Sequence, residues 1–157
     1  MDRDEELRRR LRELLEGGQA HVGLDDVTKD WPAELRGVRP PGAAHTPWQT
    51  LEHLRIALWD IVEFSRSGDH ESPSWPEGYW PPTDAPPSPE AWAESVEGIQ
   101  RDLAAMQAMI SDRQRDLYEP FPWGDGQNLL REALLAADHN AYHLGQLMTL
   151  KRLVGAA

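Results

Sequence analysis

The chain has 157 residues, 39% of them hydrophobic and 27% charged, which predicts a single globular domain whose core needs no disulfide or metal to fold. Its formal net charge of −11 argues against nucleic acid as a partner, because a polyanion would be repelled. The absence of cysteine excludes disulfides and thiolate ligands, and no apolar run approaches the ~20 residues that span a membrane, so we expect a cytoplasmic protein that does not bind membranes.

The N-terminal part predicts one helix followed by an irregular segment. The helix covers about residues 4–16, where leucines form one stripe, and it ends at the glycine pair 17–18. Arginines at positions 8–10 alternate with acidic residues and indicate a solvated helix face. Residues 17–45 are interpreted as a covering segment that contains at most a short helix, and no chemistry is assigned to them.

The second predicted helix has an explicit start and runs from Thr46 to Gly68. Thr46 is the expected N-cap, Pro47 occupies the first helical position, and Gln49 completes a capping box. Apolar residues cover far more than half of its circumference, which predicts a helix deep in the protein. Because two-fold dimers are the commonest oligomers, such a helix also favours a homodimer.

Two further helices and a long connection complete the chain. The third helix is expected to begin at Ser88-Pro89, with apolar residues in a 4-3-4-3-4 spacing, and the fourth covers about residues 127–153. The Pro/Trp-rich segment 68–88 could run the length of a helix at ~3.1 Å per residue. Such a crossover allows the second and third helices to be parallel. We therefore predict an all-α fold, an up-down-down-up four-helix bundle, in one domain of residues 1–157.

The fourth helix carries the pattern that points to chemistry. His139 and His143 lie one turn apart on a polar line along its inward face, a spacing that suits two adjacent ligands of a metal ion. Structural or surface histidines show the same pattern, so it leaves both interpretations open. His53, two turns into the buried second helix, is the candidate for a third ligand, although a single histidine in such a place is more often a hydrogen-bonded core residue than a ligand.

Other polar and aromatic residues have ordinary structural explanations beside possible functional ones. Glu132 lies on the same polar line and could orient a ligand or act as a base, but a solvated carboxylate explains it equally well. Asp60 and Asp138 lie off the relevant faces, and neither is assigned a role. The remaining histidines are expected to be ordinary residues of loops or helix ends: His21, His45 and His70. Three crossover aromatics are expected to pack onto the bundle, ahead of lining the entrance to a site: Trp75, Tyr79 and Trp80.

Three stretches of the chain resemble the DinB/YfiT-like family of bacterial proteins. They are HTPWQTLEHLRIALWDIVEFSRS, PSWPEGYWPP and PFPWGDGQNLLREALLAADHNAYHLGQLMTLKRLVG. The resemblance, strongest over about residues 46–155, implies a four-helix bundle that holds a divalent metal ion through three histidines. By position these are His53, His139 and His143. Imidazole suits several divalent metals, and we expect zinc or nickel.

The resemblance also implies two kinds of activity. Relatives include transferases and isomerases that use bacillithiol, mycothiol or glutathione, and others are described as metal hydrolases. Three neutral histidines leave coordination positions open, so either an external thiol or water could be activated there. A hydrolase generally needs a base near the activated water, and Glu132 lies roughly 10 Å along the helix from His139. We therefore favour a thiol S-transferase acting on a small-molecule electrophile, with a hydrolase second and a non-catalytic metal-binding stress-response protein third.

Overall fold

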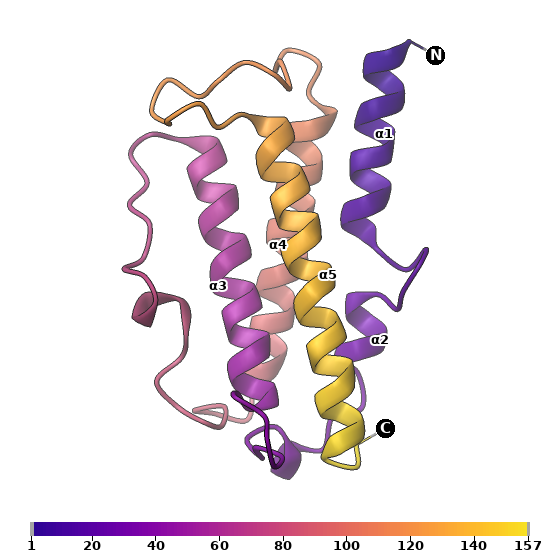
Figure 1. Ribbon diagram of the computed structural model, residues 1–157, viewed down its shortest axis with the longest axis vertical. Coiled ribbons are helices and arrows are strands. Elements are labelled where there is room, and N and C mark those ends of the chain that lie inside the picture. The colour runs from indigo at the N-terminus through magenta and orange to yellow at the C-terminus, as the bar shows by residue number, and fades with distance from the viewer. Residues whose placement is uncertain (1, 157) are drawn as a thin grey trace.

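The computed structural model describes residues 2–156, which form helices and loops (Figure 1). Within them no β-strand is formed, and the one extended pairing is an isolated bridge between Pro120 and Asn128. The prediction of an all-α fold is confirmed. The helices are α1 (Arg3–Glu16), α2 (Leu24–Thr28), α3 (Pro47–Arg66), α4 (Ala91–Ser111) and α5 (Leu129–Leu153), with 3-10 turns η1 (Ala33–Leu35) and η2 (Glu77–Tyr79). None of the helices within 2–156 combines the length and the apolar character that a membrane crossing requires.

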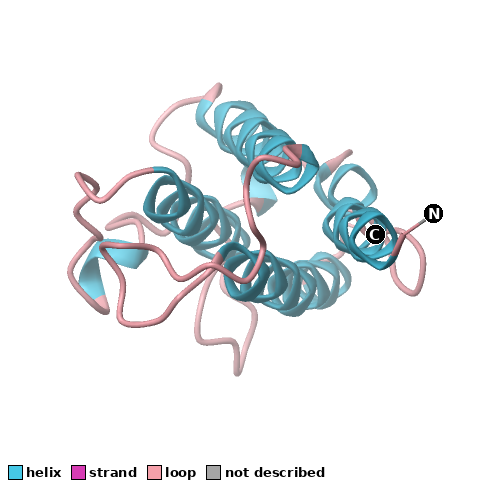
Figure 2. Ribbon diagram, turned by 90° about the horizontal axis from the view of Figure 1, so that it is seen from above, coloured by secondary structure: helices cyan, strands magenta, loops and turns pink. Residues whose placement is uncertain are grey.

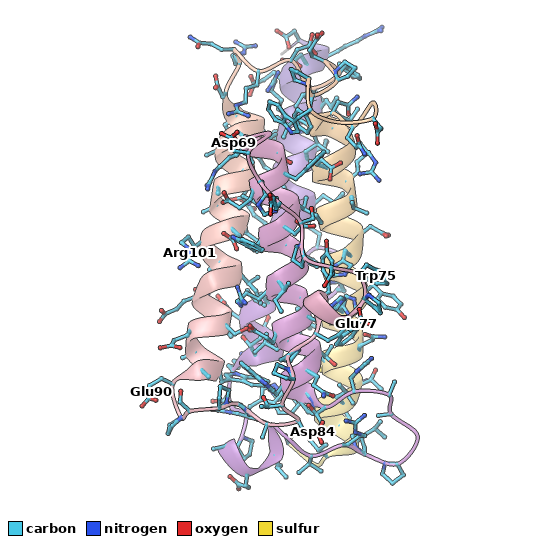
Figure 3. All side chains as sticks on the ribbon, turned by 90° about the vertical axis from the view of Figure 1, so that its left-hand side faces the viewer. Asp69, Trp75, Glu77, Asp84, Glu90 and Arg101 are labelled. Atoms are coloured by element: carbon cyan, nitrogen blue, oxygen red, sulfur yellow. The ribbon has the colours of Figure 1, made fainter. Side chains whose placement is uncertain are left out.

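The long helices surround a common core. In Figure 1, α1 and α5 descend while α3 and α4 ascend, and the view from above in Figure 2 shows these helices around one centre. Helix α3 packs mainly against α4 and α5, and α1 packs against the same two helices. The crossover between α3 and α4 descends along the bundle, with Asp69 near the top and Asp84 near the bottom of Figure 3. This course keeps the crossover beside α3.

Local hydrogen bonds explain where the helices begin. The predicted capping box of α3 is confirmed: the Thr46 hydroxyl accepts from the Gln49 backbone N–H at 3.1 Å, and the Gln49 side-chain oxygen accepts from the Thr46 N–H at 3.1 Å. The predicted start of α4 at Ser88-Pro89 is wrong, because α4 begins at Ala91. The Ser88 hydroxyl accepts from the Ala91 N–H at 3.2 Å, so this serine stabilises the turn that leads into the helix.

Arg8 corrects the prediction of a solvated face on α1. Its side chain is buried, and the guanidinium donates hydrogen bonds to the backbone carbonyls of Ile110, Asp112 and Arg115 at 2.7–3.1 Å. The last carbonyls of a helix have no partner within that helix, and a nearby arginine can satisfy them. Arg8 therefore ties α1 to the C-terminal end of α4, whereas Arg9 pairs with acidic residues of its own helix.

The apolar core does not depend on the candidate site, and we expect the fold to survive removal of metal. Apolar side chains from all the long helices are buried, including Leu11, Leu58, Met106 and Leu147. Burial of such side chains contributes about 1.5–3 kcal/mol each, so the core supplies the stability. Helical circular dichroism is expected to be unchanged by a chelator. A collapse of the helical signal would show that the site is structural and would count against catalysis.

The homodimer remains a prediction. Its basis is the apolar circumference of α3, and within one chain α4 and α5 already cover much of that surface. A dimer would therefore use another surface, for which α5 offers the exposed side chains of Leu134 and Leu135. Light scattering at micromolar protein tests the prediction, and a monomeric mass would contradict it.

Candidate metal centre

Three histidines that are far apart in the sequence lie together between α3 and α5. One nitrogen atom from each of His53, His139 and His143 lies within 4.8 Å of the other two. The Nε2 atoms of His53 and His139 are 3.2 Å apart. His53 and His143 are buried, and His139 is partly exposed. Because α3 and α5 pack side by side, the inward face of α5 delivers its two histidines to the one on α3.

Hydrogen bonds determine which nitrogen of two rings carries the proton. The Nδ1 atom of His53 donates to the Tyr79 backbone carbonyl at 2.8 Å, since a carbonyl can only accept. The Nδ1 atom of His143 donates to the Gln146 side-chain oxygen at 2.8 Å. In both rings the Nε2 atom therefore presents its lone pair. A histidine that binds a metal commonly has such a partner on its other nitrogen, which fixes the tautomer and the ring orientation.

Burial keeps these rings neutral. It lowers the pKa of His139 to about 4, with a further contribution from His53, and lowers the pKa of His143 to about 3, with further contributions from His139 and His53. Burial also lowers the pKa of His53. At neutral pH the cluster therefore offers imidazole nitrogens rather than positive charges. Neutral imidazole suits zinc and nickel, so the three residues fit the expected metal, and the group could hold an ion.

Crossover residues form one wall of the centre. The Trp80 ring lies between two histidine rings, stacked on His53 with centroids 3.9 Å apart and on His45 with centroids 3.7 Å apart. Trp75, by contrast, is 72% exposed. Tyr79 and Trp80 thus pack on the bundle as expected, but all three aromatics also line a cavity beside the histidines. The cavity has a volume of about 650 Å³.

Asp60 and His70 hold the crossover in place, although the sequence predicts no role for either residue. One oxygen of the Asp60 carboxylate accepts from the Tyr79 hydroxyl at 2.6 Å, and the other lies 2.8 Å from His70 Nε2. Burial and the neighbouring Asp60 carboxylate raise the pKa of Tyr79 to about 12, so the phenol keeps the proton that it donates. The signal that could have revealed Asp60 is its spacing of seven residues, two helical turns, from His53.

Two residues of the covering segment lie beside the cavity. His45 was expected to be an ordinary loop residue, and residues 17–45 were assigned no chemistry, yet Ala44 and His45 line the cavity. No sequence signal connects His45 with Trp80, because their contact depends on how the crossover runs. His21 is exposed, as expected.

Glu132 is buried but stands apart from the histidines. Its carboxylate pairs with the Arg131 guanidinium, and burial raises its pKa. Among the described residues it has no hydrogen bond to the three histidines, and it does not line the cavity. Asp138 also lies outside the cavity.

The lowered pKa values predict that the metal-free protein loses stability as the pH falls from 7 to 5. The folded-state pKa values of His139 and His143 lie below the unfolded value near 6.5, so the unfolded chain takes up protons first. Their contribution is intact above about pH 6.5 and is lost toward pH 4. We expect a loss of roughly 4 kcal/mol in the free energy of urea unfolding between pH 7 and pH 5, about 2 kcal/mol from each of the two histidines. The double variant His139→Gln/His143→Gln is the control, and an equal loss in it would contradict the assignment.

Comparison with known proteins identifies one family. The family model described as the DinB superfamily matches residues 3–147 of the chain. No curated protein and no solved structure matches the chain. The matched range contains the three histidines and the crossover that covers them.

Proposed function

Given that this chain belongs to the DinB superfamily, we propose that His53, His139 and His143 hold one divalent metal ion, zinc or nickel, and that the protein is a thiol S-transferase. The observation that carries the metal assignment is the convergence of three neutral imidazoles, two of them with Nδ1 already engaged. An open cavity beside them leaves room for a thiol and an electrophile.

The proposed reaction needs a thiol from outside the chain, which has no cysteine. His53, His139 and His143 would hold the divalent ion, whose positive charge would lower the pKa of a bound thiol and favour its ionised form. The thiol sulfur then forms a bond to the electrophilic carbon. In a substitution the leaving group departs with its bonding electrons and the thiol proton passes to solvent; in an addition that proton ends on the electrophile. The Tyr79 carbonyl and the Trp80 ring keep His53 oriented.

The carboxylates near the centre support transfer over hydrolysis. Hydrolysis would require a base beside the attacking water. Asp60 is the one carboxylate that lines the cavity among the described residues, and both of its oxygens are already engaged, by Tyr79 and His70. Glu132 lies outside the cavity and pairs with Arg131. A thiol that is already ionised needs no such base.

The test is an activity assay of the metal-loaded protein with a panel of low-molecular-weight thiols, including bacillithiol, mycothiol and glutathione, and a generic electrophile such as 1-chloro-2,4-dinitrobenzene. Consumption of the electrophile is expected to require both metal and thiol, and to rise with pH through an apparent thiol pKa below about 8.5. Glu132→Gln is expected to have little effect. Thiol-independent ester hydrolysis that is sensitive to Glu132→Gln would favour the hydrolase. Inactivity with every thiol and ester would favour the stress-response protein.

A further inference from the structure

A second cavity adjoins the cavity at the metal centre, and the two cavities are described below as two lobes. The first lobe, called the metal lobe here, is the cavity of about 650 Å³ that contains the three histidines. The second, called the outer lobe, has a volume of about 490 Å³ and lies between residues 41–45 and the C-terminal half of α5. The two lobes share four lining residues: Ala44, His45, Tyr142 and Gln146. A molecule with its reactive atom at the histidines could therefore extend into the outer lobe.

The lining of both lobes has no cationic side chain to receive an anion. Among the described residues, no lysine, arginine, aspartate or glutamate lines the outer lobe. Asp60 is the one charged residue of the metal lobe, and it is acidic. Arg39 lies near His45, but its guanidinium donates a hydrogen bond to the Ala44 carbonyl and forms an ion pair with Asp84 at 2.7 Å. The charge of Arg39 is therefore already paired. A carboxylate brought into the outer lobe would lose water without gaining a cation, which is costly.

The polar groups of the outer lobe suit an uncharged ligand. The oxygen of the Gln146 side chain accepts from His143, so its NH₂ group remains to donate to a ligand. The hydroxyls of Thr50 and Thr149 donate to backbone carbonyls of their own helices, which leaves their lone pairs as acceptors. The remaining lining is largely apolar, with Leu150 and Leu153 from α5.

Gly145 lines the outer lobe at a position where packing does not require glycine. It lies in the interior of α5, where glycine weakens a helix relative to alanine. A Cβ atom at this position would meet no other atom within 4 Å. A larger side chain at this position would therefore extend into the open space of the lobe.

We propose that the outer lobe binds the uncharged body of the thiol whose sulfur reaches the three histidines, so that the protein selects uncharged thiols over thiols that carry a carboxylate. This inference rests on the proposed function, because it places the thiol sulfur at the metal centre. The preference for uncharged thiols follows from the uncharged lining of the outer lobe. A thiol bound there can place its sulfur at the histidines because the two lobes share four lining residues.

The test measures thiol binding rather than turnover. The protein is loaded with cobalt(II), and the charge-transfer absorption that reports thiolate binding is titrated with 6-mercaptohexanamide and with 6-mercaptohexanoate. These thiols ionise alike because the terminal group is far from the sulfur. We expect the amide to bind about tenfold or more tightly than the carboxylate. Thr149→Lys, which adds a cation to the outer lobe, is expected to reverse that preference.

A larger side chain at position 145, which would fill the outer lobe, provides a second test of thiol binding. Gly145→Leu is expected to weaken binding of the amide by about tenfold while the cobalt stoichiometry is unchanged, and Gly145→Ala is expected to have a smaller effect. Ala104→Leu, on an exposed position of α4, is the matched control. Equal affinities for both thiols in the wild type and in Thr149→Lys, or an unaffected Gly145→Leu, would overturn the inference and leave the proposed function standing. No absorption change with either thiol would overturn both.

Discussion

His139→Ala is expected to abolish stable binding of the divalent ion. Wild-type protein should carry about one ion per chain, because the three nitrogens converge on one position. Two remaining imidazoles provide too few bonds to retain the ion against dilution. The affinity should fall by more than about a hundredfold, beyond the loss of 10–100-fold that is typical when a residue behind a ligand is changed. Elemental analysis after gel filtration and a zinc titration measure this, and thiol transfer should be lost with the metal.

The matched control for this variant is His21→Ala, which removes an exposed histidine of the covering segment. Its stoichiometry should remain at about one ion per chain, and both variants should keep the helical circular dichroism of the wild type. His53→Ala tests the ligand from the other helix. If the His53→Ala variant still bound about one ion per chain, His53 would not be a metal ligand, and His139 and His143 on α5 would be the remaining histidine ligands.

Asp60→Ala is expected to produce the second largest effect, a loss of about tenfold in metal affinity. Asp60 is not one of the three proposed ligands. Its carboxylate accepts a hydrogen bond from the Tyr79 hydroxyl, and the Tyr79 backbone carbonyl accepts a hydrogen bond from His53. Removing the carboxylate releases the crossover, so that His53 loses both its hydrogen-bond partner and the stacked Trp80 ring. Tyr79→Phe, which removes only the hydroxyl, should show a smaller loss. Isothermal titration with zinc measures both variants.

Any variant that removes a negative charge near the centre also weakens its attraction for a cation. Asp69→Ala controls for this effect, because Asp69 is an exposed acid of the same crossover and its side chain lies away from the cavity. If Asp60→Ala and Asp69→Ala lowered the affinity equally, the anchoring role of Asp60 would be wrong and the loss would be electrostatic.

The sequence by itself determined the features that depend on neighbouring residues. The capping box of α3 joins Thr46 to a residue three positions later, and such a bond forms as soon as the helix does. His139 and His143 are one helical turn apart, so their placement on one face follows from helix geometry alone. Apolar spacing likewise predicted the helices, although the start of α4 was misplaced because Ser88 satisfies a turn rather than the helix itself.

Tertiary packing decided which distant residues complete the centre. His53 lies 86 positions before His139, and only the packing of α3 against α5 brings their nitrogens to 3.2 Å. The stacking of Trp80 between two histidine rings depends on the path of a proline-rich crossover, which has no helical periodicity from which its contacts could be predicted. Arg8 was misjudged for a related reason: a charged residue among acids indicates a solvated face until another helix presents carbonyls that need a donor. Contacts of this kind follow from the three-dimensional path of the chain, on which local sequence patterns carry no information.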